Sequence, residues 1–106
     1  MELNDFQDRC HMTAVYPPDQ GIYYCSLGLA SEAGEVLGKL KKQIRGDYTY
    51  DEMKQHMVKE LGDVFWYVAD LAGCLGVTLD TLGEQVLDKL EKRLEAGTIR
   101  GSGDVR

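Results

Sequence analysis

The sequence predicts an all-α protein of four helices. Apolar residues recur at helical spacing along most of the 106-residue chain, and no stretch alternates apolar and polar residues as a β-strand would. Helix-capping residues, glycines and prolines divide the chain into segments. We therefore expect one domain over residues 1–106, with helices at about 5–16, 20–44, 50–75 and 79–96 and a flexible tail at 98–106.

The first two helices are bounded by a cap, a pair of prolines and a glycine. The first helix should start with Asn4 as its N-cap, because Gln7 can complete a capping box three residues later. It should end before Pro17–Pro18, which cannot continue a helix. Its apolar stripe is too thin for a helix that is stable alone, so we expect it to dock on the others. The second helix should run to Ile44, since Gly46 just beyond it favours a helix end.

The third and fourth helices have clear start and stop signals. Thr49 and Glu52 form a capping box that opens the third helix, and Gly76 follows its end. This helix carries the strongest apolar stripe of the chain. Thr78 caps the fourth helix, and Gly97 ends it. The Gly-rich tail after it is either a frayed terminus or a flap over a ligand.

A repeated acidic motif lies on the two central helices. Glu32 and Glu35 are followed 28 residues later (60 − 32) by Glu60 and Asp63, which have the same spacing of three. Side chains three apart lie on one helix face, so each pair can reach a common cation. A helical hairpin folded about Asp47–Tyr48 would set the two pairs opposite each other. The sequence therefore predicts that four carboxylates meet in one site.

Four facing carboxylates predict a bound divalent cation. Without a counter-charge they repel one another, and partial burial raises the cost of ionising each of them. An all-oxygen ligand set favours a hard ion, Mg²⁺ with Mn²⁺ able to substitute, over Zn²⁺ or a redox iron pair. Gly34 and Gly62, each in mid-helix, suggest the close approach of a backbone or a ligand. A single Glu-x-x-Glu motif is more often a solvated helix face, but the coincidence of two such motifs favours the metal site.

The candidates for substrate binding are basic and aromatic. Lys39 and Lys42 extend the face of the first acidic pair and can contact phosphate oxygens, although a solvated charged face explains them equally well. Tyr67 lies one turn beyond the second pair, where its hydroxyl can reach a substrate or a metal-bound water, with packing as the alternative. Lys89 and Arg93 in the fourth helix are further candidates for neutralising phosphate.

Composition argues against several classes of protein. The net charge of −6 argues against a surface for duplex nucleic acid, and a bound cation would offset part of it. Cys10, Cys25 and Cys74 have no paired spacing, so we interpret them as reduced thiols that fill the core of a cytosolic protein. The N-terminus lacks a signal-peptide pattern, and no apolar stretch approaches the ~20 residues that a membrane span needs. We therefore expect a soluble, intracellular protein that does not contact a membrane.

Three segments resemble a known family. Gly28–Val36 contains the first acidic pair, Lys59–Tyr67 contains the second, and Gly101–Asp104 is part of the Gly-rich tail. Together they resemble the single-domain, phage-type members of the MazG-like nucleoside triphosphate pyrophosphohydrolases, which are all-α enzymes. The resemblance covers the chain from about Leu27 onward. Its specific part is the two acidic pairs with 24 residues between them (60 − 35 − 1).

The resemblance implies both an architecture and an activity. It implies a four-helix bundle protomer of the all-α NTP pyrophosphatase type that assembles into an oligomer. The activity is hydrolysis of a nucleoside triphosphate to the monophosphate and pyrophosphate, for nucleotide-pool control or house-cleaning. We favour a deoxynucleoside triphosphate, although the residues themselves leave the base and the sugar open. The implied location is the cytoplasm of a bacterial cell or a phage-infected host. The implied Mg²⁺ ligands are Glu32, Glu35, Glu60 and Asp63.

Glu35 and Glu60 are the expected catalytic residues. The chain has no Gly-rich phosphate loop and no Ser, Cys or His placed as a nucleophile beside a base, so water should attack. Metal binding lowers the pKa of water toward neutrality, and Glu35 is our choice to take its proton. The resemblance, not the spacing, places the attack at the α phosphorus.

Two other functions stay open from the sequence. A di-metal carboxylate bundle would carry Glu-x-x-His motifs, which both acidic pairs lack. A non-enzymatic helical-bundle interaction module would use the acids only to solvate one face, and Mg²⁺ would not raise its unfolding midpoint.

The apolar residues also predict self-association. Four helices, the first one short, cannot cover both an aromatic cluster near the start of the second helix and an apolar group on the third. We therefore expect a homo-oligomer, with a tetramer built as a dimer of dimers preferred over a dimer. The residues concerned are Tyr16, Tyr23, Tyr24, Met53, Leu71, Cys74 and Leu75.

Overall fold

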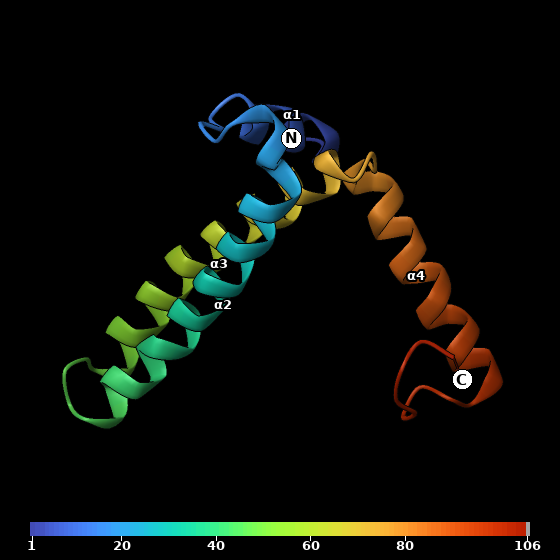
Figure 1. The fold of residues 1–106 in the computed structure, drawn as a ribbon. Coiled ribbons are helices and arrows are strands. Elements are labelled where there is room, and N and C mark those ends of the chain that lie inside the picture. The colour runs from blue at the N-terminus through green and yellow to red at the C-terminus, as the bar shows by residue number, and fades with distance from the viewer. Residues whose placement is uncertain (106) are drawn as a thin grey trace.

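In the computed structural model, which describes residues 1–105, the chain is all-α (Figure 1). The elements are α1 (Leu3–His11), a 3₁₀ turn η1 (Pro18–Gln20), α2 (Gly21–Ile44), α3 (Tyr50–Cys74) and α4 (Leu79–Ala96). This confirms the prediction of an all-α chain with four helices, and the described residues contain no strand. Within residues 1–105, no single helix is both long and apolar enough to cross a membrane; by length and composition alone, the bent pair α3 and α4 could.

Helices α2 and α3 form a long antiparallel hairpin (Figure 1). The turn between them contains Gly46, whose φ of +87° lies in the left-handed region that glycine adopts without strain. The predicted capping box then opens α3: Thr49 Oγ1 accepts from the backbone N–H of Glu52, and Glu52 Oε1 accepts from that of Thr49. Both helices lie close to their expected ranges because these end signals are local in the sequence.

Helix α1 is shorter than expected and is capped differently. It runs from Leu3 to His11 rather than over about 5–16, so the prediction of its end was wrong. Its N-cap residue, Glu2, makes no side-chain cap, and the expected capping box of Asn4 and Gln7 does not form. The side chains of Asn4 and Gln7 form hydrogen bonds with another helix instead.

The side chains of Asn4 and Gln7 cap the start of α4. Gln7 Oε1 accepts from the backbone N–H of Leu79 at 3.1 Å, and Asn4 Oδ1 accepts from that of Asp80 at 3.1 Å. Gln7 Nε2 donates to two carbonyl oxygens, one in α3 at 3.1 Å and one in the α3–α4 connection at 2.9 Å. Two N–H groups that the first turn of α4 leaves free are therefore satisfied from α1, which ties α1, α3 and α4 together.

Helix α4 leaves the hairpin instead of packing along it (Figure 1). The directions of α3 and α4 differ by 99°, and the connection between them contains Gly76 at φ +78°. Only the start of α4 joins the core, where Leu79 packs with Cys10, Ala69 and Ala72. The protomer is therefore not a closed four-helix bundle, which corrects the expectation. The physical reason is that Gly76 turns the chain while α1 holds the first turn of α4.

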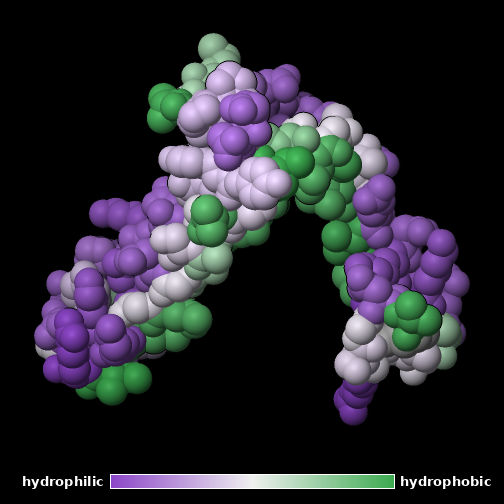
Figure 2. All heavy atoms as spheres, in the orientation of Figure 1, coloured by the Kyte–Doolittle hydropathy of each residue, from purple (hydrophilic) through white to green (hydrophobic). Residues whose placement is uncertain are grey.

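Large apolar side chains remain exposed on the α2–α3 hairpin and on α4, which we call the two arms of the molecule. On α3, Leu61 is 59% exposed and Phe65 is 41% exposed, and on α4, Leu87 and Leu94 are 59% and 71% exposed. Figure 2 shows apolar residues gathered along the inner sides of the two arms. Met53, which we expected to need cover from a partner, is buried within the chain. The other exposed side chains leave apolar surface of the kind that usually marks an interaction site.

The tail folds back along α4 in the described part of the chain, which excludes Arg106. Gly97 ends the helix at φ +71°, as the sequence predicted. Asp104 then accepts from Lys89 Nζ at 2.9 Å and from Arg93 Nη2 at 3.2 Å. The tail therefore contacts α4 through Gly103 and Asp104, and the Arg93 side chain is buried at this contact.

Candidate metal and nucleotide site

Three of the four predicted carboxylates lie together between α2 and α3. Glu32 projects from α2, Glu60 and Asp63 project from α3, and one oxygen of each lies within 4.8 Å of the others. The hairpin brings them together because antiparallel pairing sets Glu32 opposite the turn of α3 that carries the other two. Glu32 and Glu60 are half-buried, whereas Asp63 is exposed. The carboxylate group, as we call these three residues, can therefore hold a cation at the surface of the hairpin.

Glu35 lies one turn further along α2 and is outside the carboxylate group. Its side chain is 57% exposed, and its Oε2 lies 3.7 Å from Lys39 Nζ. The same ammonium lies 3.4 Å from Glu60 Oε1, and Lys39 is buried. Lys39 therefore stands between Glu35 and Glu60, and the structure brings three carboxylates together where four were expected.

The electrostatics of the carboxylate group favour a bound cation. Burial raises the pKa of Glu32, and a hydrogen bond with Glu60 and the charges of the nearby carboxylates raise it further. In Lys39, burial lowers the pKa, but the hydrogen bond with Glu60 and the charges of Glu60, Tyr48 and Glu35 together raise it by more, so the ammonium stays charged. One lysine cannot neutralise all these acids, and a divalent cation would remove the remaining repulsion. The ligands are all carboxylate oxygens, which fits Mg²⁺ or Mn²⁺.

A cleft of about 350 Å³ opens beside the carboxylate group, on the side toward α1. Trp66 and Tyr67 line it, and their rings meet edge to face with centroids 4.9 Å apart. Trp66 Nε1 donates to Thr13 Oγ1 at 2.8 Å, so the segment after α1 holds the indole in place. The cleft therefore offers hard ligands at one end and aromatic rings at the other. Its full lining is Thr13, Val15, Tyr24, Glu32, Asp63, Trp66 and Tyr67.

Tyr67 can lie against α2 because residue 28 is a glycine. A Cβ on Gly28 would lie 2.1 Å from Cε1 of the Tyr67 ring, far inside van der Waals contact. The sequence had suggested a close approach at Gly34 and Gly62, but a Cβ at either position meets nothing within 4 Å. The close contact at Gly28 instead brings Tyr67 into the cleft.

The remaining predicted substrate-binding residues are divided between the two arms. Lys42 lies on the hairpin, with Nζ 5.8 Å from the centroid of the Tyr48 ring. Lys89 and Arg93 lie on α4, where both bind Asp104. Because α4 points away from the hairpin, one chain does not bring these two residues to the carboxylate group (Figure 1).

Several lining residues were not among the predicted site residues. Thr13 and Val15 fall in the range that was expected to be helical, and they reach the cleft because α1 already ends at His11. Trp66 follows Asp63 by three residues and so shares its helix face, a signal that could have been used. Tyr24 belongs to the aromatic cluster that we expected a partner to cover.

Residues 22–97 match the family model of the MazG nucleotide pyrophosphohydrolase domain. The chain belongs to the MazG family. The MazG match includes the whole carboxylate group and confirms the resemblance seen in the sequence. This MazG protein is also 41% identical to the Gene 37 protein of Mycobacterium phage L5, over an alignment of 115 positions that covers all of both chains. No solved structure matches it significantly. Nucleotide pyrophosphohydrolysis is thus the family-level activity of the domain.

Proposed function

We propose that the protein is a Mg²⁺-dependent enzyme that hydrolyses a nucleoside triphosphate, favouring a deoxynucleoside triphosphate, to the monophosphate and pyrophosphate. The observation that carries this proposal is that Glu32 and Asp63 belong to the carboxylate group and also line the cleft that contains Trp66 and Tyr67. A nucleoside in the cleft would therefore have its phosphates at the metal ligands. Mn²⁺ can replace Mg²⁺ because both accept an all-oxygen ligand set. The physiological role that we propose for this activity is the control of nucleotide pools.

The order of residues along α2 gives the substrate a direction. Tyr24 lies at the cleft, Glu32 and Glu35 follow, and Lys39 and Lys42 come next toward the hairpin turn. At 1.5 Å per residue, the helix rises about 27 Å from the first of these residues to the last. The nucleoside then lies at the aromatic end, the α phosphorus lies over the carboxylates, and the leaving pyrophosphate lies toward the lysines.

Each acid has a separate role in this arrangement. Bound Mg²⁺ would neutralise phosphate charge and lower the pKa of the attacking water. Glu32, Glu60 and Asp63 would hold the ion. Glu35 is exposed and outside this group, so its carboxylate, which lies 3.7 Å from the Lys39 ammonium, is the one we assign to accept the proton of the attacking water. Glu60 also positions the Lys39 ammonium beside the leaving phosphates through their 3.4 Å ion pair.

We further propose a homo-oligomer, with a tetramer built as a dimer of dimers preferred over a dimer. Helix α4 leaves its own hairpin and exposes Leu90 and Leu94 to solvent. A second copy can cover these side chains and can set Lys89 and Arg93 near its carboxylate group. The net charge of −6 agrees with a nucleotide partner held through a cation rather than with a duplex nucleic acid. We place the enzyme away from membranes, in the cytoplasm of a bacterial cell or a phage-infected host.

A substrate screen with product analysis tests the proposed activity. The protein is incubated with canonical and modified ribo- and deoxyribonucleoside triphosphates in the presence of Mg²⁺, Mn²⁺ or EDTA, and the products are separated by ion exchange. We expect equal amounts of monophosphate and pyrophosphate, and no turnover with EDTA. In ¹⁸O-labelled water, attack at the α phosphorus places the label in the monophosphate.

Two results would contradict the proposal. Release of orthophosphate with a nucleoside diphosphate would show that the wrong bond was assigned. Absence of turnover with every triphosphate, together with an unfolding midpoint that Mg²⁺ does not raise, would favour a non-enzymatic interaction module.

A further inference from the structure

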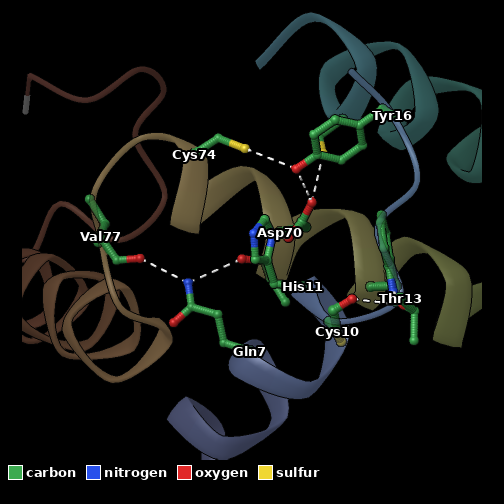
Figure 3. A network of polar contacts seen from close by, with 11 residues as sticks. Gln7, Cys10, His11, Thr13, Tyr16, Asp70, Cys74 and Val77 are labelled. Atoms are coloured by element: carbon green, nitrogen blue, oxygen red, sulfur yellow. Dashed lines mark hydrogen bonds and ion pairs between the residues drawn. The ribbon is translucent and has the colours of Figure 1, made fainter. Parts of the chain in front are cut away.

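A second group of metal-ligand side chains lies where α1 docks on the hairpin. Cys25, Asp70 and Cys74 each offer one ligand atom, and these atoms lie within 4.8 Å of one another. Cys25 is fully buried, and Asp70 is 2% exposed. Asp70 follows Asp63 by two helical turns, so this group lies about 10 Å along α3 from the carboxylate group. Figure 3 shows Asp70 and Cys74 together with His11 and Tyr16.

Asp70 is the centre of this thiol–carboxylate group. Its Oδ2 accepts from the Tyr16 hydroxyl at 2.5 Å and from Cys25 Sγ at 3.4 Å. Its Oδ1 lies 2.9 Å from His11 Nδ1, and the Tyr16 hydroxyl lies 3.4 Å from Cys74 Sγ. The side chain is therefore a buried carboxylate.

Asp70 does not need the two thiols as hydrogen-bond partners. Tyr16 and His11 already give each oxygen of Asp70 a hydrogen-bond partner, which is enough to satisfy a buried carboxylate. Two cysteines beside it add the soft ligands that select zinc over a hard cation. The spacing also fits, because tetrahedral zinc sets a sulfur and an oxygen ligand about 3.5 Å apart. The observed distance from Cys25 Sγ to Asp70 Oδ2 is 3.4 Å.

A cavity of about 320 Å³ connects the thiol–carboxylate group with solvent. His11, Asp70 and Cys74 line it, with Gln7 and residues of the α3–α4 connection. The His11 side chain is 70% exposed, yet its Nδ1 is held against Oδ1 of Asp70. This contact leaves Oδ2 facing the sulfur atoms. It also fixes the orientation of the carboxylate, as the hydrogen-bond partner behind a metal ligand does.

We propose that Cys25, Asp70 and Cys74 bind a Zn²⁺ ion at a site separate from the carboxylate group. The ion takes the place of the Tyr16 hydroxyl between Asp70 and Cys74, and a water from the cavity completes the tetrahedron. Tyr16 precedes Pro17 in the irregular connection between α1 and η1, so zinc binding requires its ring, which packs on Tyr24, to move aside and not a residue within a helix. Each thiol releases one proton, so two protons leave for every zinc ion bound. The ion clamps α2 to α3 at the end where α1 docks.

Metal analysis of the reduced, full-length chain tests this proposal without an activity assay. The metal-free protein is mixed with Zn²⁺ under anaerobic conditions, gel-filtered and analysed for metal. We expect one zinc per chain. With Co²⁺ in place of zinc, we expect a thiolate-to-metal charge-transfer absorption that one equivalent of zinc abolishes. Absence of this absorption would overturn the proposal, because it would show that no cysteine ligates the ion.

Matched variants locate the ion. Cys25→Ser and Cys74→Ser should each lose the bound zinc and weaken or abolish the cobalt absorption. Cys10→Ser is the control, because Cys10 is also a buried free cysteine but lies outside the group, and it should retain both. A chain with Glu32→Gln and Glu60→Gln should retain both as well. An unchanged absorption in Cys25→Ser and Cys74→Ser, or its loss in the glutamine double variant, would refute the site. Zinc should also raise the unfolding midpoint of the wild-type chain and not that of Cys25→Ser.

Discussion

Replacing Gly28 with alanine tests the contact that positions Tyr67 in the cleft. At an open position in mid-helix, Gly→Ala stabilises by about 1 kcal/mol, because alanine loses less backbone entropy on folding. At position 28, however, the new Cβ would lie 2.1 Å from Cε1 and 2.3 Å from Cζ of Tyr67. The ring or the helices must shift, and overpacking of this kind costs about 1–3 kcal/mol. We therefore expect Gly28→Ala to lower the free energy of unfolding by up to about 2 kcal/mol.

Gly38→Ala in the same helix is the matched control, because a Cβ there meets nothing within 4 Å. Urea unfolding followed by circular dichroism, at one fixed protein concentration, should find Gly38→Ala more stable than wild type by about 1 kcal/mol. The two variants should then differ by about 1–3 kcal/mol. Adding Tyr67→Ala removes the clashing ring, so Gly28→Ala and Tyr67→Ala should show a favourable coupling in a double-mutant cycle. If both glycine variants stabilise equally and Tyr67→Ala does not couple with position 28, the ring does not lie against α2.

Three further predictions address the site, the α1 docking and the assembly. Glu60→Gln and Glu35→Gln should each abolish turnover. The circular dichroism spectrum should stay unchanged, because losing one negative charge relieves repulsion in the metal-free state. Wild-type turnover in either variant would refute the assignment. Gln7→Ala should lower stability by about 1–3 kcal/mol because it leaves buried backbone groups of α3 and α4 unpaired, whereas exposed Gln55→Ala should change it by less than about 0.5 kcal/mol. Light scattering at micromolar concentration should give a multiple of the protomer mass, with a smaller mass for Leu94→Asp; a protomer mass for the wild type would contradict the proposed assembly.

The parts of the fold that the sequence predicted well depend on local signals. The capping box of Thr49 and Glu52 opens α3, and Gly97 ends α4, because each signal acts on backbone groups within one helical turn. The carboxylate group was predictable for a related reason. Three of the four acids in two equally spaced pairs meet, because antiparallel helices joined by a short turn keep their register over a few turns.

The direction of α4 could not be predicted from the same signals. Gly76 marks the end of α3, but a glycine cap does not specify the angle at which the next helix leaves. The exposed leucines of α4 satisfy the apolar periodicity equally well whether they pack on their own hairpin or on a partner. Apolar periodicity shows that a helix face will be buried, but it does not show which surface buries it. Lys89 and Arg93 were therefore grouped with the other basic candidates, although they lie on α4 and not on the hairpin.

The failures at α1 have a common physical cause. Gln7 caps α4, Thr13 holds Trp66 in the cleft, and His11 contacts buried Asp70. Each contact joins residues more than 50 positions apart, so it depends on where α1 docks and not on the sequence around it. This segment also lies outside residues 22–97, which match the MazG domain. The MazG segment therefore carries the carboxylate group that we propose binds the metal, whereas α1 and the chain after it shape the aromatic end of the cleft. Substitutions at Thr13 should consequently alter which nucleoside is accepted, seen as a change in KM among substrates, more than they alter the metal dependence.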